Sequence, residues 1–110
     1  MESILTSIKK LLNIGEDDEA FDMDIIMHIN SALMVLTDIG LGPADGYAIV
    51  DDGNTWEEFL GEGVNYEAAK TYVYLKVKII FDPPPSTAAL EAMNNQAKEY
   101  EWRLNVRAES

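Results

Sequence analysis

The sequence predicts an all-α protein: a small bundle of four main helices plus one short helix, with a long loop or small hairpin near 40–54. Three observations support this prediction. Apolar residues recur at three- and four-residue steps in several segments, as on the buried face of a helix. Gly15, Gly40 and the run Pro83–Pro85 fall where those segments end. A length of 110 residues suits one core, so we expect one domain over residues 1–110.

The first two helices follow from the apolar spacing. Five apolar residues predict a helix over about residues 3–13, with Gly15 as its terminating residue. The run Glu16–Glu19 reads as an exposed acidic linker. A second helix is expected to open at Phe21, with Asp22 as its cap and Gly40 beyond its end. Its predicted buried stripe is Ile25, Ile29, Ala32, Leu33, Leu36 and Ile39.

Glycines and a proline punctuate residues 40–54 around the short β-prone run Tyr47–Val50. This composition predicts a long loop, with a hairpin turning at Asp52-Gly53 as the alternative. Thr55 and Glu58 then match a capping box, which predicts a short helix that presents Trp56, Phe59 and Leu60 together.

Residues 66–81 fit two patterns. The run from Thr71 to Ile79 alternates strictly and is rich in Val, Ile and Tyr, which favours a strand. On a helical wheel the same residues form one polar stripe on an otherwise apolar surface, as in a helix surrounded by others. Asn65 would cap this helix, and Lys76 is the only charged residue on its apolar face. We favour the helix.

Three prolines make a stiff corner before the last helix. Ser86 would cap this helix, which we expect to run for about 18 residues, or roughly 27 Å. Glu99 and Arg103 are spaced as an ion pair on it. Its apolar positions are Leu90, Met93, Ala97, Tyr100 and Leu104.

The charge is strongly acidic and unevenly distributed. The formal net charge is −12, and residues 11–69 contain fourteen acids and no Lys or Arg. An acidic chain is a poor binder of phosphate backbones, so tight nucleic-acid binding is not expected. The absence of Cys excludes disulfides and thiolate metal sites and fits a reducing compartment. We find neither the order of a secretory signal nor a membrane-spanning run, and expect a soluble protein.

No group of residues predicts a catalytic, metal or cofactor site. Asp24, His28 and Ser31 share one helix face, but neighbours along one helix rarely converge as a catalytic triad, and two metal ligands are too few for zinc. The acidic runs lack the ligand spacing of a calcium loop, and the glycine cluster lacks the Lys and Ser or Thr of a phosphate loop. We therefore expect no enzyme and no cofactor.

Several residues are candidates for contacts with partners. Tyr47, Ile49 and Val50 form either part of the core or an exposed docking patch on the loop, and we favour docking for the loop tip. Lys76 could extend to solvent, pair within its chain, or pair with an acid of a neighbour. A composition typical of interfaces occurs near the end of the chain, in Trp102, Arg103, Asn105 and Arg107.

Four blocks of sequence, FDMDIIMHINSALMVL, TWEEFL, KTYVYLKVKIIFDPP and YEWRLNV, resemble in order and spacing the head-tail connector (head-completion adaptor) proteins of tailed phages. The resemblance covers almost the whole chain and carries no residue-level motif of function. It implies an all-α fold in which KTYVYLKVKIIF is helical. It also implies a structural virion protein of the neck region, assembled in the host cytoplasm into a ring, commonly of twelve copies.

In such a ring the expected partners are other copies, the portal protein and a downstream connector or tail protein, without a membrane. Genomic DNA would pass through the channel without specific binding. We hypothesise that Glu16, Asp17, Asp18, Glu19, Asp22 and Asp24 form an acidic lumen or rim that repels DNA. The alternative function is a small acidic regulatory binding protein, for example a DNA mimic that acts on a basic partner.

Overall fold

The computed structural model describes residues 2–109, which contain five helices. They are α1 (Ile4–Leu11), α2 (Asp22–Asp38), α3 (Trp56–Leu60), α4 (Glu67–Phe81) and α5 (Thr87–Glu109). Strands are absent from these residues apart from an isolated bridge between Ser3 and Thr55. The all-α prediction is therefore confirmed, and residues 40–54 form a loop rather than a hairpin.

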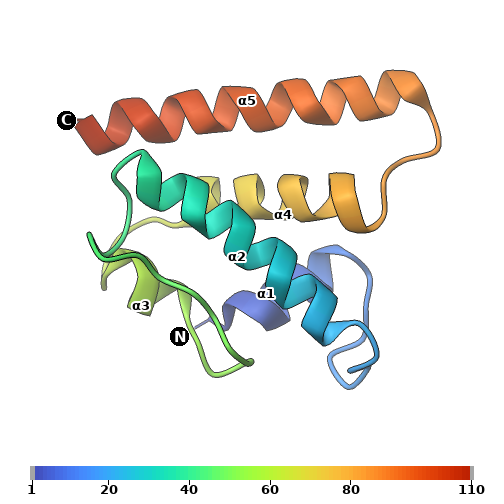
Figure 1. Ribbon diagram of the computed structural model, residues 1–110, viewed down its shortest axis with the longest axis horizontal. Coiled ribbons are helices and arrows are strands. Elements are labelled where there is room, and N and C mark those ends of the chain that lie inside the picture. The colour runs from blue at the N-terminus through green and yellow to red at the C-terminus, as the bar shows by residue number, and fades with distance from the viewer. Residues whose placement is uncertain (1, 110) are drawn as a thin grey trace.

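Helix α4 lies at the centre of the arrangement (Figure 1). It packs against α5 on one side and against α2 and α1 on others. The proline corner reverses the chain, so that α5 runs back alongside α4. In this view α5 forms one edge of the molecule, and α1 and α3 lie toward the opposite edge.

This central position explains why the sequence of α4 fits two patterns. Helices pack on several of its sides, so its buried residues spread over a wide arc of the helix instead of forming one narrow stripe. They are Ala69, Tyr72, Val73, Leu75 and Val77. The expected helix over residues 66–81 is confirmed.

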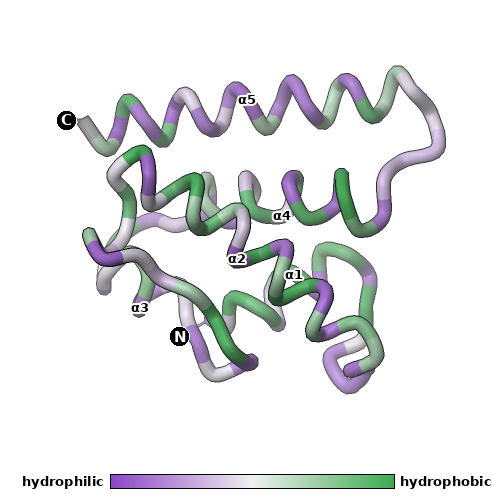
Figure 2. The backbone as a smooth tube through the Cα atoms, in the orientation of Figure 1, coloured by the Kyte–Doolittle hydropathy of each residue, from purple (hydrophilic) through white to green (hydrophobic). Residues whose placement is uncertain are grey.

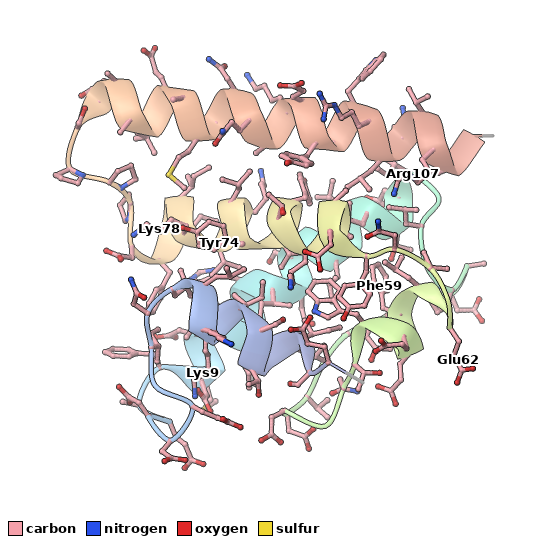
Figure 3. The ribbon with its side chains drawn as sticks, turned by 180° about the vertical axis from the view of Figure 1, so that it is seen from behind. Lys9, Phe59, Glu62, Tyr74, Lys78 and Arg107 are labelled. Atoms are coloured by element: carbon pink, nitrogen blue, oxygen red, sulfur yellow. The ribbon has the colours of Figure 1, made fainter. Side chains whose placement is uncertain are left out.

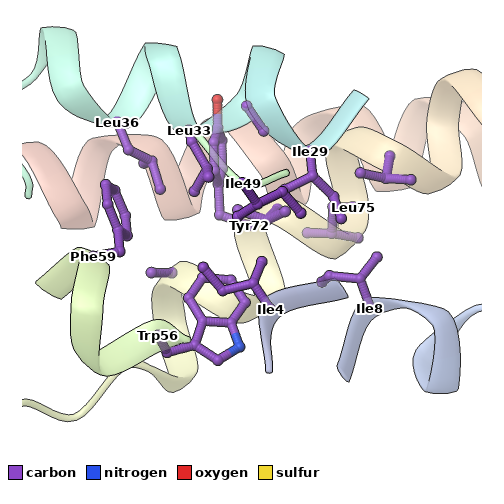
Figure 4. Packing of buried hydrophobic residues seen from close by; sticks show 14 of the residues in the cluster. Ile4, Ile8, Ile29, Leu33, Leu36, Ile49, Trp56, Phe59, Tyr72 and Leu75 are labelled. Atoms are coloured by element: carbon purple, nitrogen blue, oxygen red, sulfur yellow. The ribbon is translucent and has the colours of Figure 1, made fainter. Parts of the chain in front are cut away.

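Most of the core lies between α1, α2, α3 and α4 (Figure 4), and Ala97 and Leu104 of α5 also belong to it. Trp56 is fully buried, and its Nε1 donates a hydrogen bond to Ser7 Oγ at 2.9 Å. Its ring stacks on Tyr66 with centroids 5.8 Å apart. Trp56 N also donates to the carbonyl of Glu2, so this residue fastens the start of the chain to α3.

The helix ends differ in detail from the sequence expectations. Asn13, with φ of 63°, ends α1 in the left-handed conformation, a position expected for Gly15. The amide of Ile14 donates to the carbonyl of Lys9, and that of Asn13 to Lys10, as in a Schellman motif. Asp22 is the first residue of α2 and makes no cap hydrogen bond. Asn65 accepts from the amide of Glu67, and the capping box of α3 is present as predicted.

Helix α5 is longer than expected. It has 23 residues and reaches Glu109, because neither Gly nor Pro follows Leu104 to stop it. Ser86 Oγ accepts from the amide of Ala89, as expected of a cap. In Figure 2 the tube of α5 alternates between hydrophilic and hydrophobic residues, and Ala97 and Leu104 are the buried residues of this helix. None of the helices in residues 2–109 is both long and apolar enough to cross a membrane.

Candidate interaction surfaces

A buried lysine organises the acidic linker. Lys9 is 3% exposed, and its Nζ lies 2.7 Å from the carbonyl oxygen of Asp18 and 3.2 Å from that of Glu16. It also lies 2.8 Å from Asp22 Oδ1. Figure 3 shows Lys9 extending from α1 toward this loop. Three acceptors together offset the cost of taking the ammonium group out of water.

The linker therefore turns its carbonyl groups inward to Lys9 and its carboxylates outward. The side chains of Glu16, Asp17, Asp18 and Glu19 are exposed, as is that of Asp24. Asp22 is half-buried because it pairs with Lys9. Five of the six acids expected on a lumen or rim thus lie on an outer surface of this chain, and the sixth is partly used within it.

The loop of residues 40–54 is tied to α2 and α3. The side-chain amide of Asn30 donates to the carbonyl of Ile49 at 3.0 Å, and its oxygen accepts from the Ile49 amide at 2.8 Å. Ile49 is 1% exposed, so it belongs to the core. The docking hypothesis is therefore wrong for this residue. Val50, in contrast, is 76% exposed.

Tyr47 also packs inward. Its ring lies 5.4 Å from that of Phe59, and its hydroxyl donates to Glu58 Oε1 at 2.9 Å. Burial, together with the hydrogen bond to the Glu58 carboxylate, raises the pKa of Tyr47 to about 12. The hydrogen bonds from the Thr55 amide and Tyr47 hold the pKa of Glu58 below its usual value. Of the three loop candidates, Val50 is the one whose side chain is largely exposed.

The candidates on α5 are exposed to different degrees. Trp102 is 65% exposed and borders a shallow hollow with Ile39 and Lys98. Arg103 pairs with Glu99 at 2.7 Å, as expected, and lies over the ring of Tyr100. Asn105 is half-buried beside Trp102.

Arg107 and Lys76 lie apart from Trp102. Arg107 is exposed and borders a hollow at the start of α4, with Glu67 and Tyr100. Lys76 is half-buried on α4, and no carboxylate of the described residues lies within 4.0 Å of its Nζ. Lys76 therefore forms no ion pair within the described residues. The two remaining alternatives are that it extends to solvent or pairs with an acid of a neighbouring copy.

A further apolar surface was missed in the sequence. Met23, Met27 and Met34 are 87%, 57% and 60% exposed on one side of α2 and line a shallow hollow there. Met23 and Val50 line an adjoining hollow, so the apolar surface continues onto the loop. We call these four residues the methionine face. The signal was available, since the methionines recur at helical spacing opposite the buried stripe.

The Asp24, His28 and Ser31 group does not form a triad. Ser31 Oγ donates instead to the carbonyl of Met27 on its own helix. Among the described residues no three His, Cys, Asp or Glu side chains are grouped to hold a metal ion.

A family model described as phage connector protein matches residues 4–110, which include all five helices. Neither the curated proteins nor the solved structures contain a match to the chain.

Proposed function

The chain belongs to the phage connector protein family, and on this premise we propose that it forms a ring between the portal and the tail-side connector, extending the DNA channel after packaging. The match over residues 4–110 is the observation that carries the proposal. A connector is a structural part of the virion, and its family implies contacts with portal and tail components in the neck. The ring, commonly of twelve copies, is our more specific proposal.

The charge distribution supports a role for the acidic linker in that ring. Five exposed carboxylates, Glu16 to Glu19 and Asp24, would be repeated by symmetry around the channel or its rim. A ring of negative charge repels the phosphate backbone, so DNA would pass without adhering. The contacts of Lys9 hold the linker in one conformation, which favours the same placement of these charges in every copy.

Electron microscopy of the protein mixed with its portal tests the proposal. We expect a symmetric collar on the tail side of the portal that is absent from the portal alone. A reconstruction would also place Glu16–Asp24, and side chains directed only to outer solvent would overturn the lumen hypothesis. A chain that stays monomeric or dimeric, does not bind the portal and binds a basic partner would instead support the alternative function, a small acidic regulatory binding protein.

A further part of the proposal is that the end of α5, through Trp102, Arg103 and Arg107, binds the portal or a neighbouring subunit, and the two arginines are the residues we assign to the portal. Deleting residues 101–110 is a poor test, because Leu104 is 3% exposed and Glu101 accepts a hydrogen bond from Tyr72. Substituting Arg103→Gln together with Arg107→Gln keeps both of these features. We expect weaker attachment to the portal with unchanged helical content, and full attachment would overturn this assignment.

A further inference from the structure

Six of the ten large apolar side chains exposed in the described residues gather on two surfaces. Four of them form the methionine face of α2 and its adjoining loop. The other two, Trp102 and Val106, are 65% and 45% exposed and lie one turn apart on α5. We call these two residues the tryptophan face. Exposed apolar clusters of this kind mark sites of contact between proteins.

The two faces point away from the core on different helices. Trp102 is two residues from the buried Leu104, so it projects to nearly the opposite side of α5 from the core. The methionines likewise lie opposite the buried stripe of α2. Because α5 forms one edge of the molecule and α2 crosses α4 (Figure 1), one copy can use both faces at once.

The charges beside the two faces differ: acids alone border the methionine face, whereas charges of both signs border the tryptophan face. Asp24 and Asp38 flank the methionines on α2, and Asp51 and Asp52 line the hollow that Met23 shares with Val50. No Lys or Arg occurs anywhere in residues 11–69. Lys98, in contrast, borders the same hollow as Trp102, together with Glu101, which accepts a hydrogen bond from Tyr72. No ion pair of the described residues uses Lys98, so its charge is available to a partner.

This pattern selects one kind of contact between copies. A symmetric contact of two methionine faces would bring four aspartates against four more, and like charges at close range oppose association. A methionine face against a tryptophan face instead pairs the aspartates with Lys98 and the flexible methionines with a rigid indole. Such a contact joins different surfaces of successive copies, and it closes into a ring when the rotation allows.

We propose that the methionine face of each copy docks on the tryptophan face of the next. This inference rests on the proposed ring and identifies the surfaces that build it. It assigns a second copy of the chain, rather than the portal, as the partner that contacts Trp102.

Two complementary variants test the proposal. The first carries Met23→Gln, Met27→Gln and Met34→Gln, and the second carries Trp102→Gln and Val106→Gln. Each variant alone should lose ring assembly and bind other copies at least about thirtyfold more weakly, as loss of a central contact does. Mixed in equal amounts, they should form a one-to-one dimer, because each retains the face that the other lacks. Light scattering after gel filtration measures these masses.

A control and a second readout make every outcome decisive. Ile80 is as exposed as Met27 but lies on neither face, so Ile80→Gln should leave assembly intact. The chain has no Cys, so a Cys at Ser31 in the second variant and one at Asn95 in the first can be joined by a flexible bis-maleimide. Cross-linking should be several-fold stronger between the two variants than within either. Circular dichroism and urea unfolding check that both variants fold.

The failures can be distinguished. Rings formed by either variant, or a mixture with neither dimers nor mixed cross-links, would overturn the assigned interface while the ring itself stands. Dimers of the second variant alone would indicate a symmetric methionine contact. Rings that form without Trp102, together with loss of portal binding, would assign the tryptophan face to the portal. A wild-type chain that makes no ring, alone or on the portal, would overturn the proposed function as well.

Discussion

Lys9 Nζ lies 2.8 Å from Asp22 Oδ1 and thereby joins the end of α1 to the first turn of α2. The same ammonium group holds two carbonyl groups of the linker between these helices. The side chain of Lys9 therefore holds the acidic linker in place, and the linker itself contains no Lys or Arg. Its partners lie seven to thirteen residues away in the sequence, so the contact fixes a local loop.

Replacing Lys9 should destabilise the fold strongly. Lys9→Met would leave Asp22 and two inward carbonyl groups without their donor, and we expect a loss of about 2–4 kcal/mol in the free energy of unfolding. Urea denaturation measures it. Lys10→Met is the matched control: Lys10 is exposed, so its replacement should change stability by less than about 0.5 kcal/mol. Equal effects of the two variants would contradict the role of Lys9.

The hydrogen bond between Trp56 and Ser7 gives a second prediction. Ser7→Ala leaves the buried Nε1 without an acceptor, and we expect a cost of about 1–3 kcal/mol, measured by urea unfolding. Ser31→Ala removes an exposed serine hydroxyl bonded within one helix and should cost less than about 0.5 kcal/mol. An unaffected Ser7→Ala variant would show that Nε1 is satisfied in another way.

Two glycines of the loop are expected to respond differently to alanine. Both have positive φ, 74° at Gly42 and 94° at Gly46, so each alanine costs about 1 kcal/mol or more in backbone strain. A Cβ at Gly42 would also collide with the ring of Phe59, whereas one at Gly46 meets open space. Gly42→Ala should therefore lower the melting temperature clearly more than Gly46→Ala. Equal losses would mean that the loop moves away from Phe59 at little cost.

Tyr47 should make stability depend on alkaline pH. Its pKa is raised from 10.0 to about 12, so between these values the folded chain retains a proton that the unfolded chain loses. Its stabilising contribution is complete below pH 10 and is lost as the pH rises through about 12. Tyr72, whose pKa is raised by burial and by Glu101, acts in the same direction.

The variant Tyr47→Phe isolates this contribution. Urea midpoints of the variant and the wild type should differ near neutral pH, where the hydrogen bond to Glu58 is intact. The difference should shrink above pH 10, as the wild type loses its advantage. A difference that stays constant up to about pH 12 would contradict the assignment to Tyr47.

The helices were easier to predict from the sequence than the interaction surfaces, because helix formation depends on residues that lie three or four positions apart. The capping box of Thr55, the cap at Ser86 and the Glu99–Arg103 pair each involve residues three or four apart and are present. The role of Asn30 was not predictable in this way, since its partner Ile49 is nineteen residues distant and lies in a loop. For the same reason the burial of Ile49 depended on a contact that no local pattern encodes.

The choice between helix and strand in α4 needed a different kind of information. Residues such as Val73, Leu75 and Val77 alternate because three neighbouring helices bury α4 from several sides. How many helices pack on α4 is set by the tertiary arrangement. The methionine face could have been predicted, because Met23, Met27 and Met34 follow the helical period, but a stripe opposite the core has no structural role that would draw attention to it.

The last prediction concerns the charge of the acidic linker, Glu16–Glu19, and not its conformation. Neutralising Glu16→Gln, Asp17→Asn, Asp18→Asn and Glu19→Gln keeps the backbone contacts of Lys9, since these use carbonyl oxygens. Stability should therefore change little, and ring assembly should persist.

The neutralised rings should bind double-stranded DNA at low ionic strength more tightly than wild-type rings, because less negative charge faces the phosphates. A control variant with Asp45→Asn, Glu62→Gln, Asp82→Asn and Glu91→Gln has the same net charge, and its four sites are also exposed. If the linker lines the channel or its rim, the control should bind DNA clearly less than the linker variant in a filter-binding assay. Equal binding by the two variants would mean that total charge alone governs DNA repulsion, and that the linker has no special place beside the channel.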